Sequence, residues 1–361
     1  MVRSQHAAHH LNDSLRRSRL PSSSPHALLA FQSFPNLFKM HLPPLDVAVY
    51  PVVSMNYGRY ARTSTRPSST TSNDSFSSSS SSSTCAPTTD FSSIQKTIQG
   101  VFRSTKVTVK EAECLTGRLH QVYLARLADG SALVLKYPPH RSTRALRHER
   151  YGLETEHKTL EILRGFQDLP VPQAYKYKAR GGNLDSSFLL MSYVPGTRLA
   201  DLLPRLSAKQ RSAIDYTLGT YVRALTMLTA TSFGTTHEVF SKKGRSTWRE
   251  TFLALLESAL RDGEDMLVTL PYDSIRYYIN QHAHELDDVK TPYMIPLGMC
   301  DPQNVLIHEQ TSRITGLVGF SNVFWGDPLM NCGIANDSDA FFQGLGERPP
   351  QTGAPYSRRL M

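Results

Sequence analysis

"HQVYLARLADGSALVLKY", residues 120–137, consists of two alternating runs on either side of Asp129-Gly130. This dipeptide favours the tight turn of a β-hairpin, so the two runs predict paired strands. Just upstream, "VTVKEAECLTGR" (107–118) predicts a third strand and a loop with a single glycine, Gly117. We therefore expect a small sheet to be built around this hairpin.

The segment after the hairpin, "TRALRHERYGLETEHKTLEILRGF" (143–166), has the spacing of an amphipathic helix, with leucines along one face. Glu156 falls inside this apolar stripe, and a buried carboxylate needs a partner. Lys136, at the charged end of "ALVLK", is the nearest suitable one. Alternatively, Glu156 sits at the edge of the stripe and Lys136 extends its ammonium group to water. Glu149, on the same face, is the second candidate for the carboxylate.

The remaining pattern predicts an α+β fold with two lobes, of the kind in which a small sheet is joined to a helical body. A strand, a turn at Gly181-Gly182 and a strongly apolar strand at Phe188–Val194 complete the small lobe, and Pro195-Gly196 ends it. Helical periodicity follows at 207–230, 247–267 and 273–289. We assign 96–194 to a β-rich N-lobe of nucleotide-binding type and 195–361 to a helical C-lobe.

Residues 1–95 differ from the rest in composition, and they include an unbroken serine run at Ser77–Ser83. Such a segment has too little apolar surface to offset the entropy cost of ordering, so we expect a disordered tail rich in Ser and Arg. Its first 60 residues are also nearly free of acids, as in a mitochondrial transit peptide. The alternatives are a solvated tail or a start codon set too early, with Met40 or Met55 as later starts.

Charge and cysteine content limit the partners of the chain. The 40 Lys and Arg exceed the 31 Asp and Glu, but no dense basic block of the kind that binds nucleic acid is present. The four cysteines lie far apart, without the paired spacing of zinc sites or disulfide frameworks. No run approaches the ~18 apolar residues of a membrane helix. We expect a cytoplasmic protein, with mitochondria as the alternative, that binds neither nucleic acid nor membrane.

Several short pieces, in their order and spacing, resemble the aminoglycoside phosphotransferase family, small-molecule kinases with a protein-kinase-like fold. The pieces are "LVLK", "LETEHKTLEIL", "LLMSYVPG", Phe233-Gly234, "PQNVLI" and "ITGLVGFSNVFWGDPL". The resemblance implies that Lys136 holds the phosphates of ATP and that Glu156 pairs with this lysine. It also implies that Met191–Gly196, including Met191 and Tyr193, is the hinge that binds the adenine ring.

The resemblance also implies that this sequence lacks two carboxylates of the family. The family's His-Gly-Asp falls on Leu297-Gly298-Met299, its asparagine matches Asn304, and its metal-binding aspartate falls on Gly319. The first aspartate acts as base towards the acceptor hydroxyl, and the second holds Mg²⁺. Methionine and glycine can do neither, and Asn304 alone cannot hold the ion. We expect a degenerate member that binds ATP but not Mg²⁺, and in which Met299→Asp with Gly319→Asp would restore a metal site.

Asp301 is the candidate that could rescue catalysis, because it is the only acid between Val289 and His308. The alternative is an ordinary turn residue before Pro302, a position that suits aspartate. Asp327 in the intact "WGDP" resembles a structural aspartate that braces the catalytic loop.

Two functions follow from the resemblance. The first is a pseudokinase that binds a nucleotide, a small molecule or a protein partner. The alternative is an active ATP-dependent O-phosphotransferase acting on a hydroxyl of a small metabolite, with Asp301 as base. Similar proteins of filamentous fungi resemble accessory genes of secondary metabolism. The chain also ends earlier than its relatives usually do, so we expect Phe341 and Phe342 to lack part of their packing unless the gene model is short.

Overall fold

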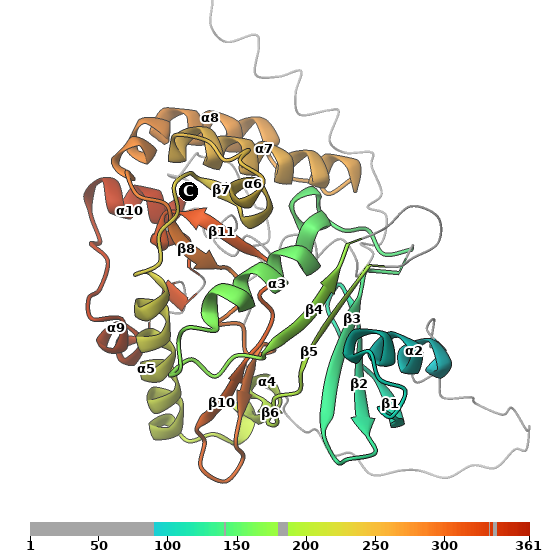
Figure 1. Cartoon of the computed structure of the whole chain (residues 1–361). Coiled ribbons are helices and arrows are strands. Elements are labelled where there is room, and N and C mark those ends of the chain that lie inside the picture. The colour runs from blue at the N-terminus through green and yellow to red at the C-terminus, as the bar shows by residue number, and fades with distance from the viewer. Residues whose placement is uncertain (1–89, 141, 180–186, 332, 335–337) are drawn as a thin grey trace, which may run out of the picture.

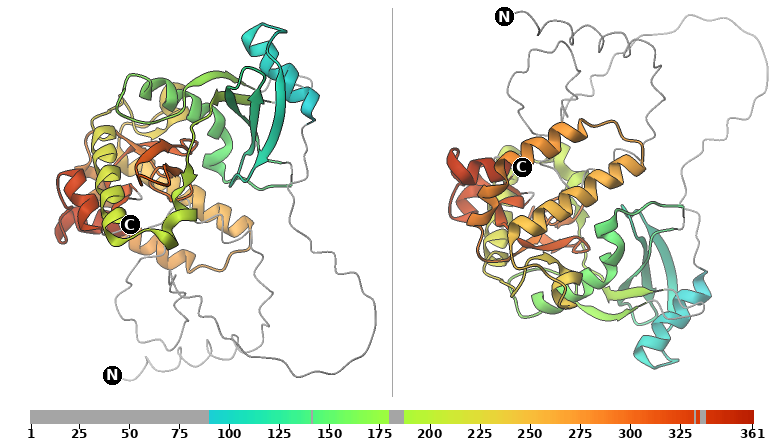
Figure 2. Two further views of the ribbon diagram at one scale, coloured as in Figure 1. Left: turned by 90° about the horizontal axis from the view of Figure 1, so that it is seen from below. Right: turned by 90° about the horizontal axis from the view of Figure 1, so that it is seen from above.

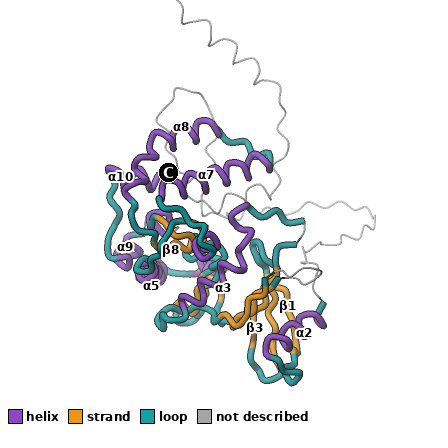
Figure 3. The backbone as a smooth tube through the Cα atoms, turned by 45° about the horizontal axis from the view of Figure 1, so that its top comes forward, coloured by secondary structure: helices purple, strands orange, loops and turns teal. Residues whose placement is uncertain are grey.

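The structure is a computed structural model that describes residues 90–361 except 141, 180–186, 332 and 335–337. The predicted tail up to residue 89 and the predicted turn at Gly181-Gly182 lie outside the described residues. The chain forms the predicted two lobes, a small β-rich N-lobe and a larger helical C-lobe (Figure 1). Figure 3 shows the long strands β1 and β3 gathered in the N-lobe, away from the helices α7 and α8.

The N-lobe is built on an antiparallel sheet with the strand order β1-β2-β3-β5-β4. The predicted hairpin forms its centre, since Arg126 pairs with Ala132 across the turn. The strands are β1 (Val109–Leu115), β2 (Gln121–Leu127), β3 (Ala132–Tyr137), β4 (Ala174–Lys178) and β5 (Phe188–Ser192).

The two faces of this sheet are covered by different helices. On one side, Leu135 of β3 and Leu190 of β5 pack with Ile94 and Ile98 of α2 (Phe91–Phe102). The neighbouring residues along the strands point the other way, because side chains alternate in a strand. Lys136 and Leu189 therefore lie on the face towards α3 (Gly152–Leu163), which follows the 3-10 helix η2 (Arg147–Tyr151).

The predicted boundary at residue 95 is wrong, because it falls inside α2. Ile94 is 1% exposed and belongs to the core beneath the sheet. The side chain of Gln95 also donates to the carbonyl of Val107 at 2.7 Å and accepts from the amide N–H of Val109 at 2.6 Å. The folded body therefore includes residues that composition alone assigned to the tail.

The C-lobe contains the predicted long helices α5, α7 and α8, together with short strands that carry the loops of interest. Figure 2 shows α7 and α8 side by side on the outer surface of this lobe. Two three-stranded sheets have the orders β10-β9-β6 and β7-β11-β8. The remaining elements are β6 (Thr197–Arg198), α4 (Leu199–Leu202), η3 (Leu203–Arg205), α5 (Ala208–Leu225), β7 (Gly234–Thr235), α6 (Thr236–Phe240), α7 (Trp248–Asp265), α8 (Tyr272–His282), η4 (Ala283–Asp288), β8 (Tyr293–Pro296), β9 (Val305–Ile307), β10 (Ile314–Leu317), β11 (Val323–Gly326), η5 (Pro328–Met330), α9 (Asp339–Leu345) and α10 (Gly353–Leu360).

The expectation that Phe341 and Phe342 lack packing is also wrong. Both side chains are buried, at 2% and 4% exposure. Helix α9 can pack here because its backbone directly contacts the backbone of α5. A β-carbon at Gly219 would lie 2.1 Å from the carbonyl oxygen of Phe341. A β-carbon at Gly344 would lie 2.0 Å from the carbonyl oxygen of Tyr216. The paired glycines let the last part of the chain cover the C-lobe.

Candidate functional site

Lys136 and Glu156 meet on the α3 face of the N-lobe sheet. The Lys136 ammonium lies 2.7 Å from Oε1 of Glu156, and the two side chains are 13% and 1% exposed. The other carboxylate oxygen, Oε2, is buried without a hydrogen-bond partner among the described residues. A buried oxygen of this kind normally has a partner, such as water or a ligand. Glu149, the second candidate, instead caps η2 at the Leu146 N–H and pairs with Arg118.

Helix α3, which carries Glu156, is fastened to the C-lobe through α6. Glu154 accepts a hydrogen bond from Lys158 at 2.6 Å and lies 3.0 Å from Nδ1 of His237. The His237 ring also stacks on Tyr151, with centroids 3.5 Å apart. Burial alone would raise the pKa of Glu154, but Lys158 and His237 outweigh it and lower that pKa. These contacts hold the Lys136–Glu156 pair at a set position between the lobes.

The predicted hinge, Met191–Gly196, begins within the last two residues of β5. Met191 is 2% exposed, within the core that lies under α3. The Tyr193 N–H donates to the carbonyl of Ala132 at 3.3 Å, so the hinge remains hydrogen-bonded to β3 at this residue. Gly196 has φ 151°, and a β-carbon there would lie 2.4 Å from Oγ1 of Thr315. Only glycine fits where the chain crosses this tightly from one lobe to the other.

The loop that carries Leu297 and Met299 is turned into the core. Met299 is fully buried and packs in the same core as Val305 and Phe320, while Leu297 is 6% exposed in the second core of the C-lobe. Between them, the carbonyl of Gly298 accepts a hydrogen bond from the Asn304 amide at 2.8 Å. An aspartate at 299 would therefore place a carboxylate among apolar side chains, where its charged form is costly.

Gly319 leaves no room for a side chain beside Asn304. Its φ is +85°, a backbone conformation that side chains rarely adopt, and a β-carbon there would lie 2.6 Å from both Cγ and Nδ2 of Asn304. The Asn304 amide thus occupies the space in which an aspartate at 319 would begin. The double substitution expected to restore a metal site would also require Asn304 to leave its bond to Gly298.

The residues present do not fit a magnesium ion. Mg²⁺ requires an octahedral shell of oxygen ligands, usually with one or two protein carboxylates. Asn304 offers a single amide oxygen, and Gly319 offers no side chain. Within the residues that the structure describes, no three His, Cys, Asp or Glu side chains gather at a point where they could hold a metal.

Asp301 is exposed, and its carboxylate closes its own turn. Oδ1 accepts from the Gln303 N–H at 2.9 Å, and the Asp301 carbonyl accepts from the Asn304 N–H at 2.8 Å. This is the local bonding expected of an aspartate before proline. The hydrogen bond to Gln303 occupies Oδ1 of the carboxylate and fixes its orientation within the turn.

Asp327 is 3% exposed and braces the end of the chain. It accepts from the Leu329 N–H at 3.0 Å and from Nε of Arg358 at 2.9 Å, so the C-terminal helix α10 is tied to the loop after β11. Burial raises the pKa of this carboxyl, and Arg358 opposes that effect. Since both oxygens are engaged, Asp327 has the role of a structural residue.

His120 lies near Lys136 and Glu156 and was not among the residues predicted from the sequence. It lies in the loop between β1 and β2, and its ring packs against Gly152 at the start of α3. Burial lowers the pKa of His120 to about 4, and Lys136 and Arg118 add to this effect while Glu156 opposes it. The single Gly117 in the loop was the available signal, because a β-carbon there would lie 2.5 Å from the carbonyl oxygen of His120.

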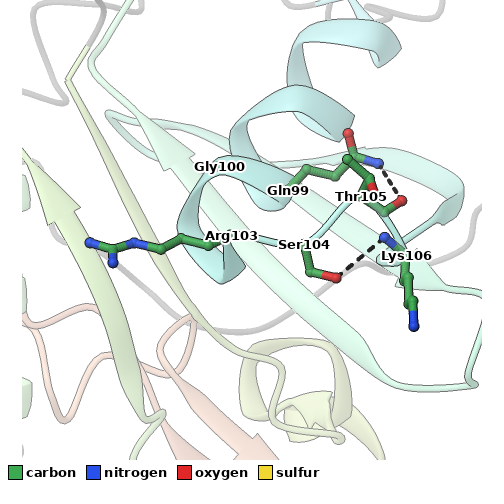
Figure 4. Close-up of a pocket in the computed structure, with 6 residues that line it drawn as sticks. All are labelled: Gln99, Gly100, Arg103, Ser104, Thr105 and Lys106. Atoms are coloured by element: carbon green, nitrogen blue, oxygen red, sulfur yellow. Dashed lines mark hydrogen bonds between the residues drawn. The ribbon is translucent and has the colours of Figure 1, made fainter.

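A separate shallow hollow lies at the C-terminal end of α2 (Figure 4). It is lined by Gln99, Gly100, Arg103, Ser104, Thr105 and Lys106. Helix α2 packs on the face of the sheet opposite to the one that carries Lys136. The contacts within the hollow are local, such as the Gln99 amide donating to the carbonyl of Thr105 at 3.1 Å. None of the residues expected to bind a nucleotide lines this hollow.

The two-lobed arrangement, with a lysine–glutamate pair between sheet and helix, defines a kinase-like fold. Residues 112–349 match the model of the phosphotransferase enzyme family APH, and the chain belongs to this family. No curated protein matches the sequence. Among the described residues, no helix is both long enough and apolar enough to cross a membrane.

Solved structures with the same fold are only distantly similar in sequence. The GDP and kanamycin complex of APH(2")-IIia is 17% identical, with a TM-score of 0.50 over 74% of this chain and 86% of that one. A thermostable mutant of the aminoglycoside phosphotransferase APH(4)-Ia, bound to AMP-PNP and hygromycin B, is 16% identical, with a TM-score of 0.50 over 74% and 87%. Macrolide 2'-phosphotransferase MphH from Brachybacterium faecium is 15% identical, with a TM-score of 0.46 over 73% and 87%.

Proposed function

We propose that this protein is a pseudokinase that binds a nucleotide, with ATP as the expected ligand, and transfers no phosphoryl group. The observation that carries the proposal is the buried Lys136–Glu156 pair together with the missing carboxylates at Met299 and Gly319. The pair supplies a positive charge for phosphates, whereas the base and the metal ligand of phosphoryl transfer are absent from these two positions. Related structures contain GDP or AMP-PNP, which supports a nucleotide as ligand.

Acidic side chains along α7 are paired with arginines of the protein, which argues against a polycationic second ligand such as an aminoglycoside. Arg276 binds Glu257 at 3.0 Å and Glu264 at 2.9 Å, and Arg147 pairs with Asp262 and Asp265. These carboxylates are neutralised within the protein. A small hydroxylated metabolite, as expected for an accessory protein of secondary metabolism, or a protein partner fits the proposal better.

The competing function is an active O-phosphotransferase with Asp301 as base. The test measures ADP formation from Mg-ATP, alone and with a panel of hydroxylated metabolites, for wild type and for Asp301→Asn. We expect no turnover above background from either protein. Wild-type turnover that disappears in Asp301→Asn, but survives in the matched exposed variant Asp201→Asn, would establish the active enzyme and sink the pseudokinase proposal.

A further inference from the structure

His120 reaches from the β1–β2 loop of the N-lobe to two other segments of the site. A β-carbon added at Gly152 would lie 2.9 Å from Cε1 and 3.1 Å from Nε2 of His120, and 3.4 Å from Cβ of Ser321. Gly152 opens α3 one turn before Glu156, and Ser321 follows Gly319 by two residues. The imidazole therefore lies where the β1–β2 loop, α3 and the loop after β10 meet.

The charges around His120 come from each element that surrounds the ring. Glu156 of α3, Lys136 of β3 and Arg118 of the β1–β2 loop all act on it electrostatically. Arg118 is itself paired with Glu149 at 2.7 Å, and Glu156 with Lys136 at the same distance. The loop after β10 contributes the uncharged Ser321 and Asn322. Lys136 and Arg118 are each paired with one carboxylate, so the charges around the ring balance while the imidazole is neutral. A proton on His120 would leave one positive charge in excess at this corner of the site.

We propose that His120 binds the phosphates of a nucleoside polyphosphate, and that its imidazole takes up a proton on binding and supplies, with Lys136, positive charge that a carboxylate-held Mg²⁺ would otherwise bring. This inference rests on the proposed nucleotide-binding function. The inference names protonated His120 as the cation that acts beside Lys136. Nucleotide binding would then need no metal ion. Glycine at 152 is part of the arrangement, because a larger residue would displace the ring.

The physical basis is a change in the surroundings of the ring. In the unliganded protein, burial holds the pKa of His120 at about 4, so the ring is neutral at pH 7. Negative phosphate oxygens at hydrogen-bond distance favour the protonated form and raise the pKa. Because the bound state then holds an additional proton, nucleotide affinity increases as the pH falls from the pKa of the complex towards that of the free protein.

The test compares wild type with His120→Gln, which keeps an N–H donor but cannot be protonated. ATP binding in EDTA is measured by calorimetry at pH 6, 7 and 8, in buffers of different ionisation enthalpy, to count the protons taken up. His284→Gln, an exposed histidine in η4, is the matched control. ATP titrates identically in all three experiments, so the difference between variants reports His120. We expect wild type and His284→Gln to gain about tenfold more affinity from pH 8 to pH 6 than His120→Gln.

Each outcome separates this inference from the proposed function. Equal proton uptake and equal pH dependence in wild type and His120→Gln would overturn the role of His120, while nucleotide binding would stand. Absence of ATP binding to wild type at every pH would overturn the proposed function, and this inference with it. If His120→Gln does not fold, the NMR titration of the His120 Cε1–H in wild type, with and without ATP, decides the matter; a pKa unchanged by ATP contradicts the proposal.

Discussion

The Asn304 amide fills the space that a side chain at Gly319 would need. A β-carbon at 319 would lie 2.6 Å from Cγ of Asn304, and the amide is held there by its 2.8 Å hydrogen bond to the carbonyl of Gly298. A side chain at position 319 would therefore require Asn304 to move away from Gly298.

Gly319→Ala is expected to cost more in wild type than in an Asn304→Ala background. In wild type, alanine at 319 is destabilised in two ways. Its positive φ strains the backbone, which costs about 1–3 kcal/mol of unfolding free energy, and its methyl group collides with the Asn304 side chain. Without the Asn304 side chain, only the backbone term remains. Urea unfolding of the four proteins gives the coupling energy, which we expect to be at least about 0.5 kcal/mol. Additive costs would show that Asn304 moves aside freely.

ATP is expected to raise the melting temperature of wild type equally in EDTA and in Mg²⁺. At a ligand concentration 100 times Kd, the free energy of unfolding rises by about 2.7 kcal/mol. The double variant Lys136→Met with Glu156→Gln should lose the ATP effect and still fold, because neither partner is left as an unpaired buried charge. Lys209→Met, at an exposed position, is the control. A shift that needs Mg²⁺ would contradict the lost metal site.

A chain that begins at Asp90 is expected to melt like the full chain, because the predicted tail cannot form a core. A chain that begins at Lys96 should lose at least about 2 kcal/mol of unfolding free energy, since it lacks the buried Ile94 and the bonds of Gln95 to β1. Thermal and urea unfolding measure both differences. Ile94→Ala in the full chain should show part of the same loss, and equal stability of the two shortened chains would place α2 outside the fold.

The unliganded protein is expected to lose stability as the pH falls from about 6.5 to 4. Burial lowers the pKa values of His120 and His148 from 6.5 to about 4, so the unfolded chain binds protons in this range that the folded protein does not. Each histidine can change the unfolding constant up to about tenfold per pH unit. His148→Leu should reduce this slope, and His284→Gln should not. An unchanged slope in His148→Leu would show that His148 titrates normally.

Strand alternation and helical period were sufficient to predict the two-lobed fold, because they record which face of each element is buried. Alternation in "ALVLK" put Lys136 on one face of β3, and the leucine spacing put Glu156 on the inner face of the helix that covers it. The resemblance that places Met299 and Gly319 at the family's two carboxylate positions also comes from the sequence, and neither residue has a side-chain carboxylate.

Only the tertiary structure decided which distant residues share a space. The approach of His120 to Gly152, the blocked position beside Gly319 and the contact of Gly219 with α9 join segments far apart in the chain. Such contacts leave no periodic signal, because they depend on distances of a few ångströms set by the packing of whole elements. For the same reason composition placed α2 partly in the tail: Ile94 and Gln95 acquire their role from a sheet that forms later in the sequence.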